Sequence, residues 1–268
     1  MIPSWLQSVR GTVGGRWGRS RLEPVGVLVQ ACLGAGTVPG LLNGLAGGKT
    51  FLEHQLERVL IAFDRPRCLV VTTELPENRA IRRICGDLGV PCYVGDRYDA
   101  LGNCLRAARR ERFRSAMVLR ADSPLIDPAL MVRVMAEYLR CGHPSTYTGN
   151  RLQKTFPAGM EVEITGVDRL QQAFLAAQCW ADFLDPTALL RRGGLADCRR
   201  VDVVQSVDQS RWSLRLDTAD DQRRLARLLG LVQKYSLEEV MRVAEVHGLL
   251  AEPSTTGGRG PVPGSDAG

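Results

Sequence analysis

The feature that most constrains the fold is the alternation of short apolar runs with amphipathic stretches along most of the chain. This alternation is typical of a layered sheet whose strands are joined by crossover helices. In the first half, strands are predicted at residues 25–29, 68–71, 91–94 and 116–119, with helices at 50–63, 81–88 and 101–108. The sequence therefore predicts an α/β protein whose first half is Rossmann-like.

The pattern changes after residue 120, where longer connections and isolated strands appear. Helices are predicted at residues 128–139, 170–177, 219–229 and 237–246, and extended segments at 145–148, 160–164, 201–204 and 214–216. Ser236 and Glu239 have the spacing of a capping box at the start of the last helix. We therefore expect a mixed, mostly parallel sheet flanked by helices.

The 268 residues are enough for one domain with a substantial core. We expect a single domain over residues 25–250, a flexible basic extension at 1–24 and a disordered tail at 251–268. No apolar run reaches the length of about eighteen residues that a membrane span needs. The eight cysteines show no C-x-x-C pair, so we expect no zinc site but reduced, mostly buried thiols in a cytoplasmic protein.

The net charge of +6 raises the question of nucleic-acid binding. The basic residues are almost all arginines, and they are spread over the predicted helices rather than gathered into a stripe with interleaved aromatic residues. We therefore expect no nucleic-acid partner.

Residues 30–41, with the sequence QACLGAGTVPGL, form a glycine-rich connection between the first strand and the first helix. Backbone N–H groups in such a position can hold phosphate. A tight strand-to-helix connection without a ligand is the alternative explanation. The segment contains no charged residue, which is unusual for a phosphate-binding loop in a chain with 35 Lys and Arg.

Two aspartates follow predicted strands of the same sheet. Asp122 comes after the strand at 116–119, and Asp217 comes after the strand at 214–216. Carboxylates at strand ends can hold Mg²⁺, because this ion binds to one or two carboxylates together with substrate phosphates. Each aspartate has a structural alternative, as a turn cap for Asp122 and as a helix N-cap for Asp217. Asp127, before Pro128, is best explained as an N-cap.

Five fragments then occur in a recognisable order: QACLGAGTVPGL (30–41), GGKTFLEH (47–54), ADSPLIDP (121–128), TFPAGMEVE (155–163) and WSLRLDTADD (212–221). Together they resemble the CTP-dependent sugar cytidylyltransferases of the spore-coat polysaccharide type, which are relatives of the CMP-sialic acid and CMP-Kdo synthetases. The resemblance extends from about residue 25 to residue 229. It implies the Rossmann-like fold of nucleotide-diphospho-sugar transferases.

The resemblance also implies an activity, in which CMP passes from CTP to an oxygen of a sugar or sugar acid for polysaccharide or glycoconjugate synthesis. It implies Mg²⁺ as cofactor and a homodimer that pairs through residues 145–200. The implied roles are as follows: nucleotide binding by Gln30, Ala31, Gly34, Ala35 and Gly36; catalysis by Lys49 and Asp122; metal binding by Asp122 and Asp217; and substrate binding by Asn150, Pro157, Gly159 and Glu161. We add Arg120 to the catalytic residues because of its charge beside Asp122, although the family has another residue there.

The departures from the family pattern are concentrated in the glycine-rich loop. Cys32, Thr37 and Leu41 stand where the family has two arginines and a lysine, and Ala35 replaces a serine. A charge-assisted hydrogen bond contributes roughly 1.5–3 kcal/mol, so these losses should weaken triphosphate binding on the order of a thousandfold or more. Arg120 replaces a threonine or similar residue and can supply one compensating charge.

Two classes of function therefore stay open. The first is a divergent Mg²⁺-dependent nucleotidyltransferase, which the two retained aspartates favour. The second is a catalytically impaired family member that acts as a binding or scaffolding partner. A GT-A-type glycosyltransferase ranks third, because the sequence after the strand at 116–119 lacks the Asp-x-Asp that such enzymes use.

Overall fold

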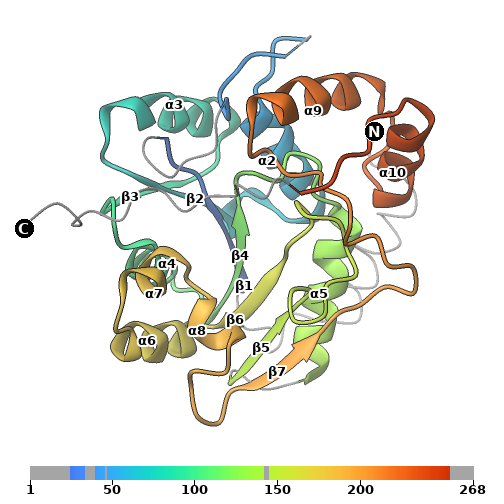
Figure 1. The fold of residues 1–268 in the computed structure, drawn as a ribbon. Helices are drawn as coiled ribbons and strands as arrows, with labels where there is room; N and C mark the ends of the chain where they lie inside the picture. The colour runs from blue at the N-terminus through green and yellow to red at the C-terminus, as the bar shows by residue number, and fades with distance from the viewer. Residues whose placement is uncertain (1–24, 34–39, 46, 142–144, 254–268) are drawn as a thin grey trace, which may run out of the picture.

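The computed structural model describes residues 25–33, 40–45, 47–141 and 145–253 (Figure 1). The basic extension at 1–24, most of the tail predicted at 251–268, and the loop residues Gly34, Ala35 and Gly36 lie outside the described residues. The predictions for those segments therefore stay predictions.

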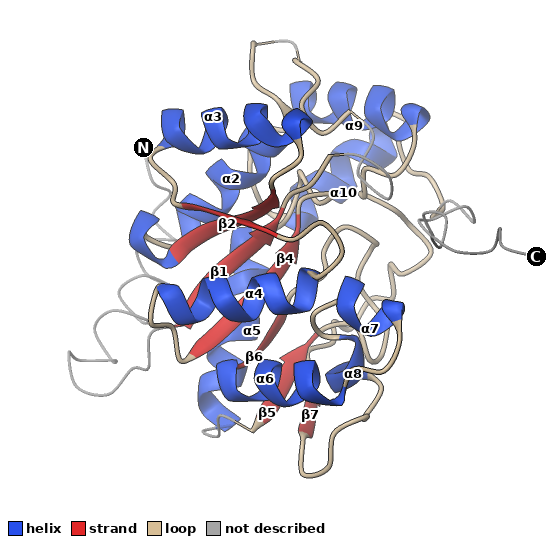
Figure 2. Ribbon diagram, turned by 90° about the vertical axis from the view of Figure 1, so that its left-hand side faces the viewer, coloured by secondary structure: helices blue, strands red, loops and turns tan. Residues whose placement is uncertain are grey.

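The described chain builds one mixed sheet in the order β3-β2-β1-β4-β6-β5-β7 (Figures 1 and 2). Its strands are β1 (Val25–Gln30), β2 (Cys68–Thr73), β3 (Cys92–Gly95), β4 (Ser115–Arg120), β5 (Thr146–Gly149), β6 (Glu163–Gly166) and β7 (Arg199–Asp202). Strand β6 runs antiparallel to both of its neighbours, whereas the other paired strands are parallel. The predicted fold class is confirmed, and the carboxyl ends of all strands except β6 meet at one edge.

Helices cover both faces of this sheet (Figure 2). They are α2 (Phe51–Ala62), α3 (Arg79–Leu88), α4 (Ala100–Arg110), α5 (Pro128–Cys141), α6 (Val167–Ala176), α7 (Trp180–Leu184), α8 (Ala188–Arg191), α9 (Ala219–Leu231) and α10 (Leu237–Val246), with 3-10 turns η1 (Arg65–Arg67) and η2 (Pro76–Asn78). The larger apolar core includes buried side chains of α2, α3, α5, α9 and α10. The smaller core includes those of α4, α6 and α8. Burial of these side chains is the main contribution that fixes the helices to the sheet.

Side-chain caps determine where several helices begin. Thr50 and Glu53 form a capping box at α2, and Thr218 and Asp221 form one at α9. The carboxylate of Asp127 accepts a hydrogen bond from Ala129 N (2.6 Å) at the start of α5, as predicted for an N-cap. Its second oxygen accepts one from Leu237 N (2.8 Å), which joins α10 to α5.

The last helix begins with half of the predicted capping box. Ser236 accepts a hydrogen bond from Glu239 N (3.4 Å). The Glu239 carboxylate does not return the bond to the Ser236 backbone but pairs with Arg242 at 2.9 Å. The ion pair with Arg242 in the same helix therefore accounts for the absence of the hydrogen bond from Ser236 N to the Glu239 carboxylate.

Two predicted strands differ in the structure. Residues 214–216 do not belong to the sheet, because Leu214 N donates to Ala158 O (2.7 Å) and Leu216 N donates to Asp122 O (2.9 Å), both in loops. The strand predicted at 160–164 begins only at residue 163. Before that point the Asn150 amide takes the place of a partner strand, donating to Met160 O (2.7 Å) and accepting from Val162 N (2.9 Å).

All eight cysteines are free, as expected. The expectation that most are buried is wrong, since Cys68, Cys85 and Cys104 are buried and the other five are partly or fully exposed. Among the described residues, no helix is both long enough and apolar enough to cross a membrane.

Candidate functional site

The candidate site lies at the carboxyl edge of the sheet, where β1 and β4 end side by side. Gln30 and Arg120 are paired residues of the two parallel strands. Ala121 N donates to Gln30 O (2.9 Å), so the pairing continues past the last strand residue. Ala31 is fully buried. The beginning of the glycine-rich loop therefore lies beside the segment that carries Arg120 and Asp122.

The described ends of the loop are held by uncharged groups. Asn78 is fully buried, accepts a hydrogen bond from Leu33 N (2.7 Å) and donates to Thr73 Oγ1 (2.7 Å). Cys32 Sγ lies 3.4 Å from the same hydroxyl. Leu41 is buried in the larger core. Two of the positions that lack the expected cations therefore serve to anchor the loop to the body of the protein.

Asp122 is almost completely buried, with an exposed fraction of 1%, although it stands in a loop. Arg120 Nε donates to its Oδ2 (2.7 Å), and Ser123 Oγ donates to its Oδ1 (3.0 Å). The negative charge of Asp122 is the main cause of a raised pKa at Arg120. The two residues form a pair that the sequence alone did not predict.

The side chain of Gln55 in α2 holds the turn around Asp122 in place. Its amide donates to Arg120 O (2.6 Å) and accepts from Ser123 N (3.2 Å), and the side chain is fully buried. The partners in these two hydrogen bonds are separated by 65 and 68 positions in the chain. No local sequence pattern signals such a contact, which explains why Gln55 was not predicted as part of the site.

Asp217 is held close to Asp122 by the segment from Leu214 to Leu216, through the Leu216 N to Asp122 O hydrogen bond described above. Its carboxylate pairs with Arg215, whose Nε and Nη2 both lie 2.6 Å from Oδ2. The predicted alternative for Asp217 as a helix N-cap is wrong, because Thr218 caps α9. The structure thus brings both predicted aspartates to one place.

Burial and the neighbouring carboxylates act on the pKa of Arg215 in opposite directions. Burial by itself lowers the pKa of this guanidinium, but the hydrogen bond and charge of Asp217 raise it, helped by Asp122 and Glu161. The net direction is upward. Arg215 therefore stays protonated and interacts with all three carboxylates of the site.

The predicted substrate-binding residues lie in the segment between β5 and β6. Gly159 N donates to Glu161 Oε2 (2.8 Å), and Ala158 N donates to Trp212 O (2.9 Å). Pro157 is buried in the turn that Met160 N closes, whereas Asn150 holds the backbone before β6. Gly159 and Glu161 therefore lie next to the segment that carries Arg215. Asn150 holds the backbone of the same loop through its hydrogen bonds with Met160 and Val162.

Lys49, predicted as a catalytic cation, precedes α2. Its ammonium pairs with Glu57 of that helix (2.6 Å) rather than with either aspartate. The hydrogen bond that the ammonium donates to Glu57 raises the pKa of Lys49.

Glu161 provides a test of the electrostatics of the site. Burial raises the pKa of its carboxyl, and the charge of Asp122 raises it further, against the opposing effect of Arg151 and Arg215. A raised folded-state pKa gives a contribution to stability that is fully present below the unfolded pKa and is lost as the pH rises through the folded pKa. We therefore expect Glu161→Gln to raise the free energy of unfolding at about pH 7 and to lose this advantage at about pH 4.

Urea unfolding of both proteins across this pH range is the measurement. Gln keeps an oxygen that can accept the Gly159 hydrogen bond, so the comparison isolates the charge. A variant that is less stable than the wild type by the same amount at every pH would contradict the predicted electrostatic effect.

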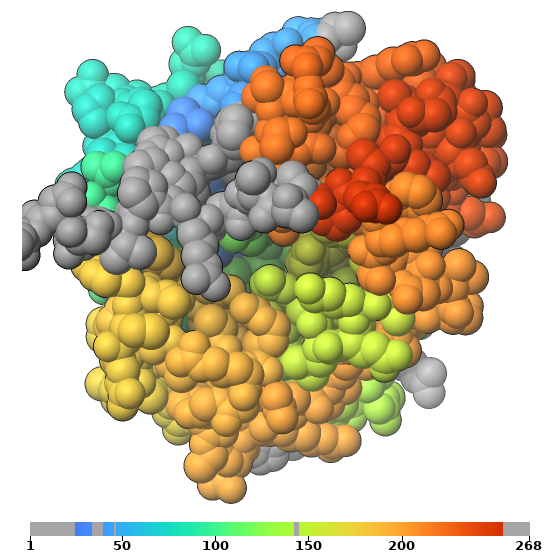
Figure 3. Space-filling model, viewed as in Figure 1, coloured from blue at the N-terminus to red at the C-terminus, as the bar shows by residue number. Residues whose placement is uncertain are grey.

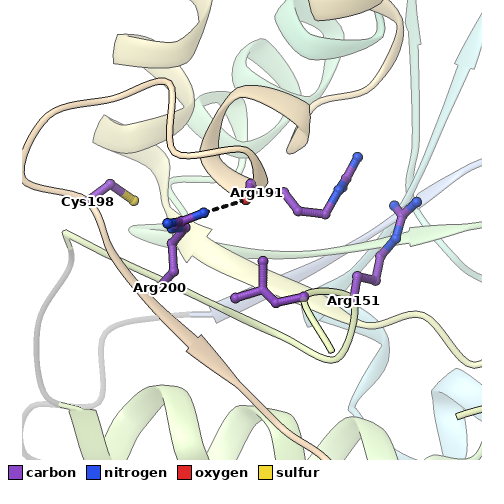
Figure 4. A pocket seen from close by; sticks show the side chains of 5 residues that line it. Arg151, Arg191, Cys198 and Arg200 are labelled. Carbon is purple, nitrogen blue, oxygen red and sulfur yellow. Dashed lines mark hydrogen bonds between the residues drawn. The ribbon is translucent and has the colours of Figure 1, made fainter. Parts of the chain in front are cut away.

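A pocket of about 670 Å³ adjoins this segment and is lined by Arg151, Leu152, Arg191, Cys198 and Arg200 (Figure 4). Arg200 Nη1 donates to Arg191 O (3.1 Å). Arg151 and Arg191 each donate to the buried carboxylate of Glu163, at 2.8 and 2.7 Å. The pocket therefore has a cationic lining whose inner part is balanced by a buried acid.

In the space-filling view, green-coloured atoms of the segment near residue 120 are recessed between α9 and the yellow part of the chain around α7 and α8 (Figure 3). Arg151 acts electrostatically on Arg120 and on Glu161. One residue of the pocket lining, Arg151, therefore interacts electrostatically with residues of the candidate site.

The donor chemistry of the two aspartates decides whether they suit a metal ion. The described residues contain no group of three His, Cys, Asp or Glu side chains that could hold a metal ion. Mg²⁺ nevertheless needs only one or two carboxylates when water and substrate phosphates complete its coordination. Asp122 and Asp217 supply carboxylates, the ligand type that such a site needs. Each of the two carboxylates is paired with an arginine.

The comparisons with known proteins gave structural matches only. Neither the protein-family models nor the curated proteins gave a match to the sequence. A cytidylyltransferase from Leptospira borgpetersenii serovar Hardjo-bovis superimposes with a TM-score of 0.78 at 21% identity, over 85% of this chain and 96% of that one. The chain shares the fold of this cytidylyltransferase.

Two further structures share this fold. The synthetase of CMP-2-keto-3-deoxy-manno-octonic acid, complexed with CTP, matches 77% of this chain and 98% of its own at 15% identity, with a TM-score of 0.52. Rv0371c from Mycobacterium tuberculosis, complexed with manganese, matches 76% and 98% at 18% identity, also with a TM-score of 0.52. A nucleotide and a divalent cation are thus present in structures with the cytidylyltransferase fold.

Proposed function

We propose that the protein transfers CMP from CTP to an oxygen of a sugar or sugar acid, with release of pyrophosphate, for polysaccharide or glycoconjugate synthesis. The observation that supports this most is the hydrogen bond between Leu216 N and Asp122 O (2.9 Å), which holds the segments of Asp122 and Asp217 together. This pair lies at the carboxyl edge of the sheet, where ligands of open α/β sheets bind. A spore-coat-type acceptor specificity is part of the same proposal.

The chain's own residues would act mainly by positioning and by stabilising charge, which are the dominant contributions in phosphoryl-type transfer. Gln30, Ala31 and the loop residues Gly34, Ala35 and Gly36 would hold the nucleotide. Arg120 would face its phosphates, and Lys49 would support the loop from the start of α2. Asn150, Pro157, Gly159 and Glu161 would form the acceptor side, next to the arginine-lined pocket.

Asp122 and Asp217 would hold a Mg²⁺ ion that arrives with the nucleotide. When bound, the ion would supply neutralisation of the phosphate charge. The Glu161 carboxylate, which interacts electrostatically with Asp122, accepts a hydrogen bond from Gly159 N and is oriented by it. We also propose a homodimer through residues 145–200, which is supported by the exposed apolar side chains Leu175, Trp180 and Leu184 in that segment.

A second function, nucleotide binding without turnover, is favoured by one specific observation. The described loop positions that lack cations are structural, with Cys32 next to Thr73 and Leu41 in the core. A small movement of the loop therefore cannot bring positive charge to these two positions. A binding or scaffolding protein would be the result if Arg120 does not compensate for this loss.

Pyrophosphate release with CTP, Mg²⁺ and a panel of sugars and sugar acids distinguishes these two functions. We expect release that depends on both CTP and one class of acceptor, and Asp122→Asn, which removes one carboxylate charge, should not support it. Tight binding of CTP without release for any acceptor would overturn the enzyme and favour the binding protein.

A further inference from the structure

The site contains the sequence Arg-x-Asp twice, as Arg120-Ala-Asp122 and as Arg215-Leu-Asp217. In each copy the arginine side chain contacts the carboxylate two residues further along the chain. The guanidinium Nε donates to Oδ2 at 2.7 Å in the first pair and at 2.6 Å in the second. Each aspartate that is proposed to bind metal thus already has a cationic partner.

The exposure of the first pair is uneven. The Asp122 side chain is 1% exposed, whereas the Arg120 side chain is 58% exposed. In the second pair, Arg215 is 24% exposed and Asp217 is 15% exposed. A ligand that arrives from solvent therefore meets the guanidinium of Arg120 before it meets the Asp122 carboxylate.

The position of these two arginines complements the composition of the loop. Gln30, the first loop residue, is the cross-strand partner of Arg120. Residues 30–41 contain no Lys or Arg. Arg215 is close enough to Asp122 for that carboxylate to help raise its pKa. Two cations thus stand beside Asp122, whereas residues 30–41 contribute none.

We propose that Arg120 and Arg215 are the phosphate-binding residues of this site, and that Asp122 and Asp217 hold them in position until a polyphosphate competes for their N–H groups. A planar guanidinium can donate to a phosphate with the geometry that it uses toward a carboxylate. The exchange therefore needs only side-chain rotation. The identity of the nucleotide rests on the proposed function, whereas recognition of the polyphosphate does not.

Competition between the carboxylates and a polyphosphate predicts that loss of a carboxylate charge increases polyphosphate affinity. If the carboxylates restrain the arginines, neutralising Asp122 should strengthen the binding of a polyphosphate in the absence of metal. If Asp122 serves only as a metal ligand, its neutralisation should have no effect when no metal is present. Polyphosphate binding measured in the presence of a chelator therefore distinguishes the two roles of Asp122.

Isothermal titration of the full-length chain with inorganic tripolyphosphate in excess EDTA is the test. We expect Arg120→Gln and Arg215→Gln each to weaken binding about tenfold and Asp122→Asn to strengthen it severalfold, the range of one charge-assisted hydrogen bond. Arg242→Gln is the matched control, because Arg242 is also exposed (62%) and also pairs with a carboxylate, that of Glu239. It should bind tripolyphosphate like the wild type.

Two further measurements separate binding from folding. Thermal unfolding shows whether each variant is folded, and Arg120→Lys, which keeps the charge, should recover part of the lost affinity. The proposal is overturned if the two arginine variants bind like Arg242→Gln, or if neither the wild type nor Asp122→Asn binds tripolyphosphate. Tripolyphosphate binding as expected, with no preference for CTP over other triphosphates, would instead contradict the proposed function alone.

Discussion

Replacement of Glu163 with alanine should lower the free energy of unfolding by about 3–5 kcal/mol. Glu163 is 5% exposed and accepts hydrogen bonds from Tyr147 Oη (2.6 Å), Arg191 Nη1 (2.7 Å) and Arg151 Nη1 (2.8 Å). Without this carboxylate, two guanidinium groups and a phenol lose the acceptor that their burial requires. Asp185, which also pairs with Arg191 at 2.6 Å, limits the loss by keeping one partner.

Urea unfolding measures this effect, and Glu239→Ala provides the control. Glu239 also pairs with an arginine, but on the surface of α10, where the loss should be below about 1 kcal/mol. A Glu163→Ala variant that loses no more stability than Glu239→Ala would show that the buried network is not what fixes β5, β6 and α8 to one another.

Replacement of Gly159 with alanine should cost about 3 kcal/mol or more, because it combines strain at positive φ with overpacking. Gly159 has φ of +92°, and a Cβ there would lie 2.7 Å from Leu214 C and 2.8 Å from Leu214 O. Both neighbours are backbone atoms that cannot rotate away. The segment from Leu214 to Asp217 must therefore move, and with it the Arg215–Asp217 pair.

Gly230→Ala is the matched control for Gly159→Ala. Gly230 lies inside α9, and nothing stands within 4 Å of an added Cβ. Its replacement should stabilise the protein by roughly 0.5–1 kcal/mol, because alanine has the higher helix propensity. Thermal unfolding and tripolyphosphate titration of both variants are the measurements. Equal behaviour of the two variants would contradict the close packing between Gly159 and the segment that carries Asp217.

The parallel half of the fold could be predicted because its signals are local. The buried runs at β1, β2 and β4 and the cap at Asp127 need no distant partner to be recognised. The extended segment at 214–216 has the same apolar pattern as a strand. Its partners are loops, at Ala158 and Asp122, and periodicity does not identify a partner.

The same distinction applies to the site. Asp122 and Asp217 were predicted because each follows an apolar run, and the residue before Asp217 donates a hydrogen bond to Asp122 O. Their shared metal site stays a prediction, because the segment before Asp217 is not the sheet strand on which that prediction depended. Arg215 carries a local signal, since it stands two residues before Asp217 as Arg120 stands before Asp122, but only the structure shows that each arginine contacts its own aspartate. Gln55 acts through contacts more than sixty positions away, and the short helices α7 and α8 depend on ion pairs that single-segment patterns do not contain.

The central claim is that the carboxyl edge of this sheet is a CTP site, and calorimetric titration with CTP in the presence of Mg²⁺ tests it most directly. We predict saturable binding of CTP that is tighter than that of ATP, GTP or UTP and that is weakened in Asp217→Asn. Absence of CTP binding at millimolar concentration, or equal affinity for all four nucleotides, would contradict the account.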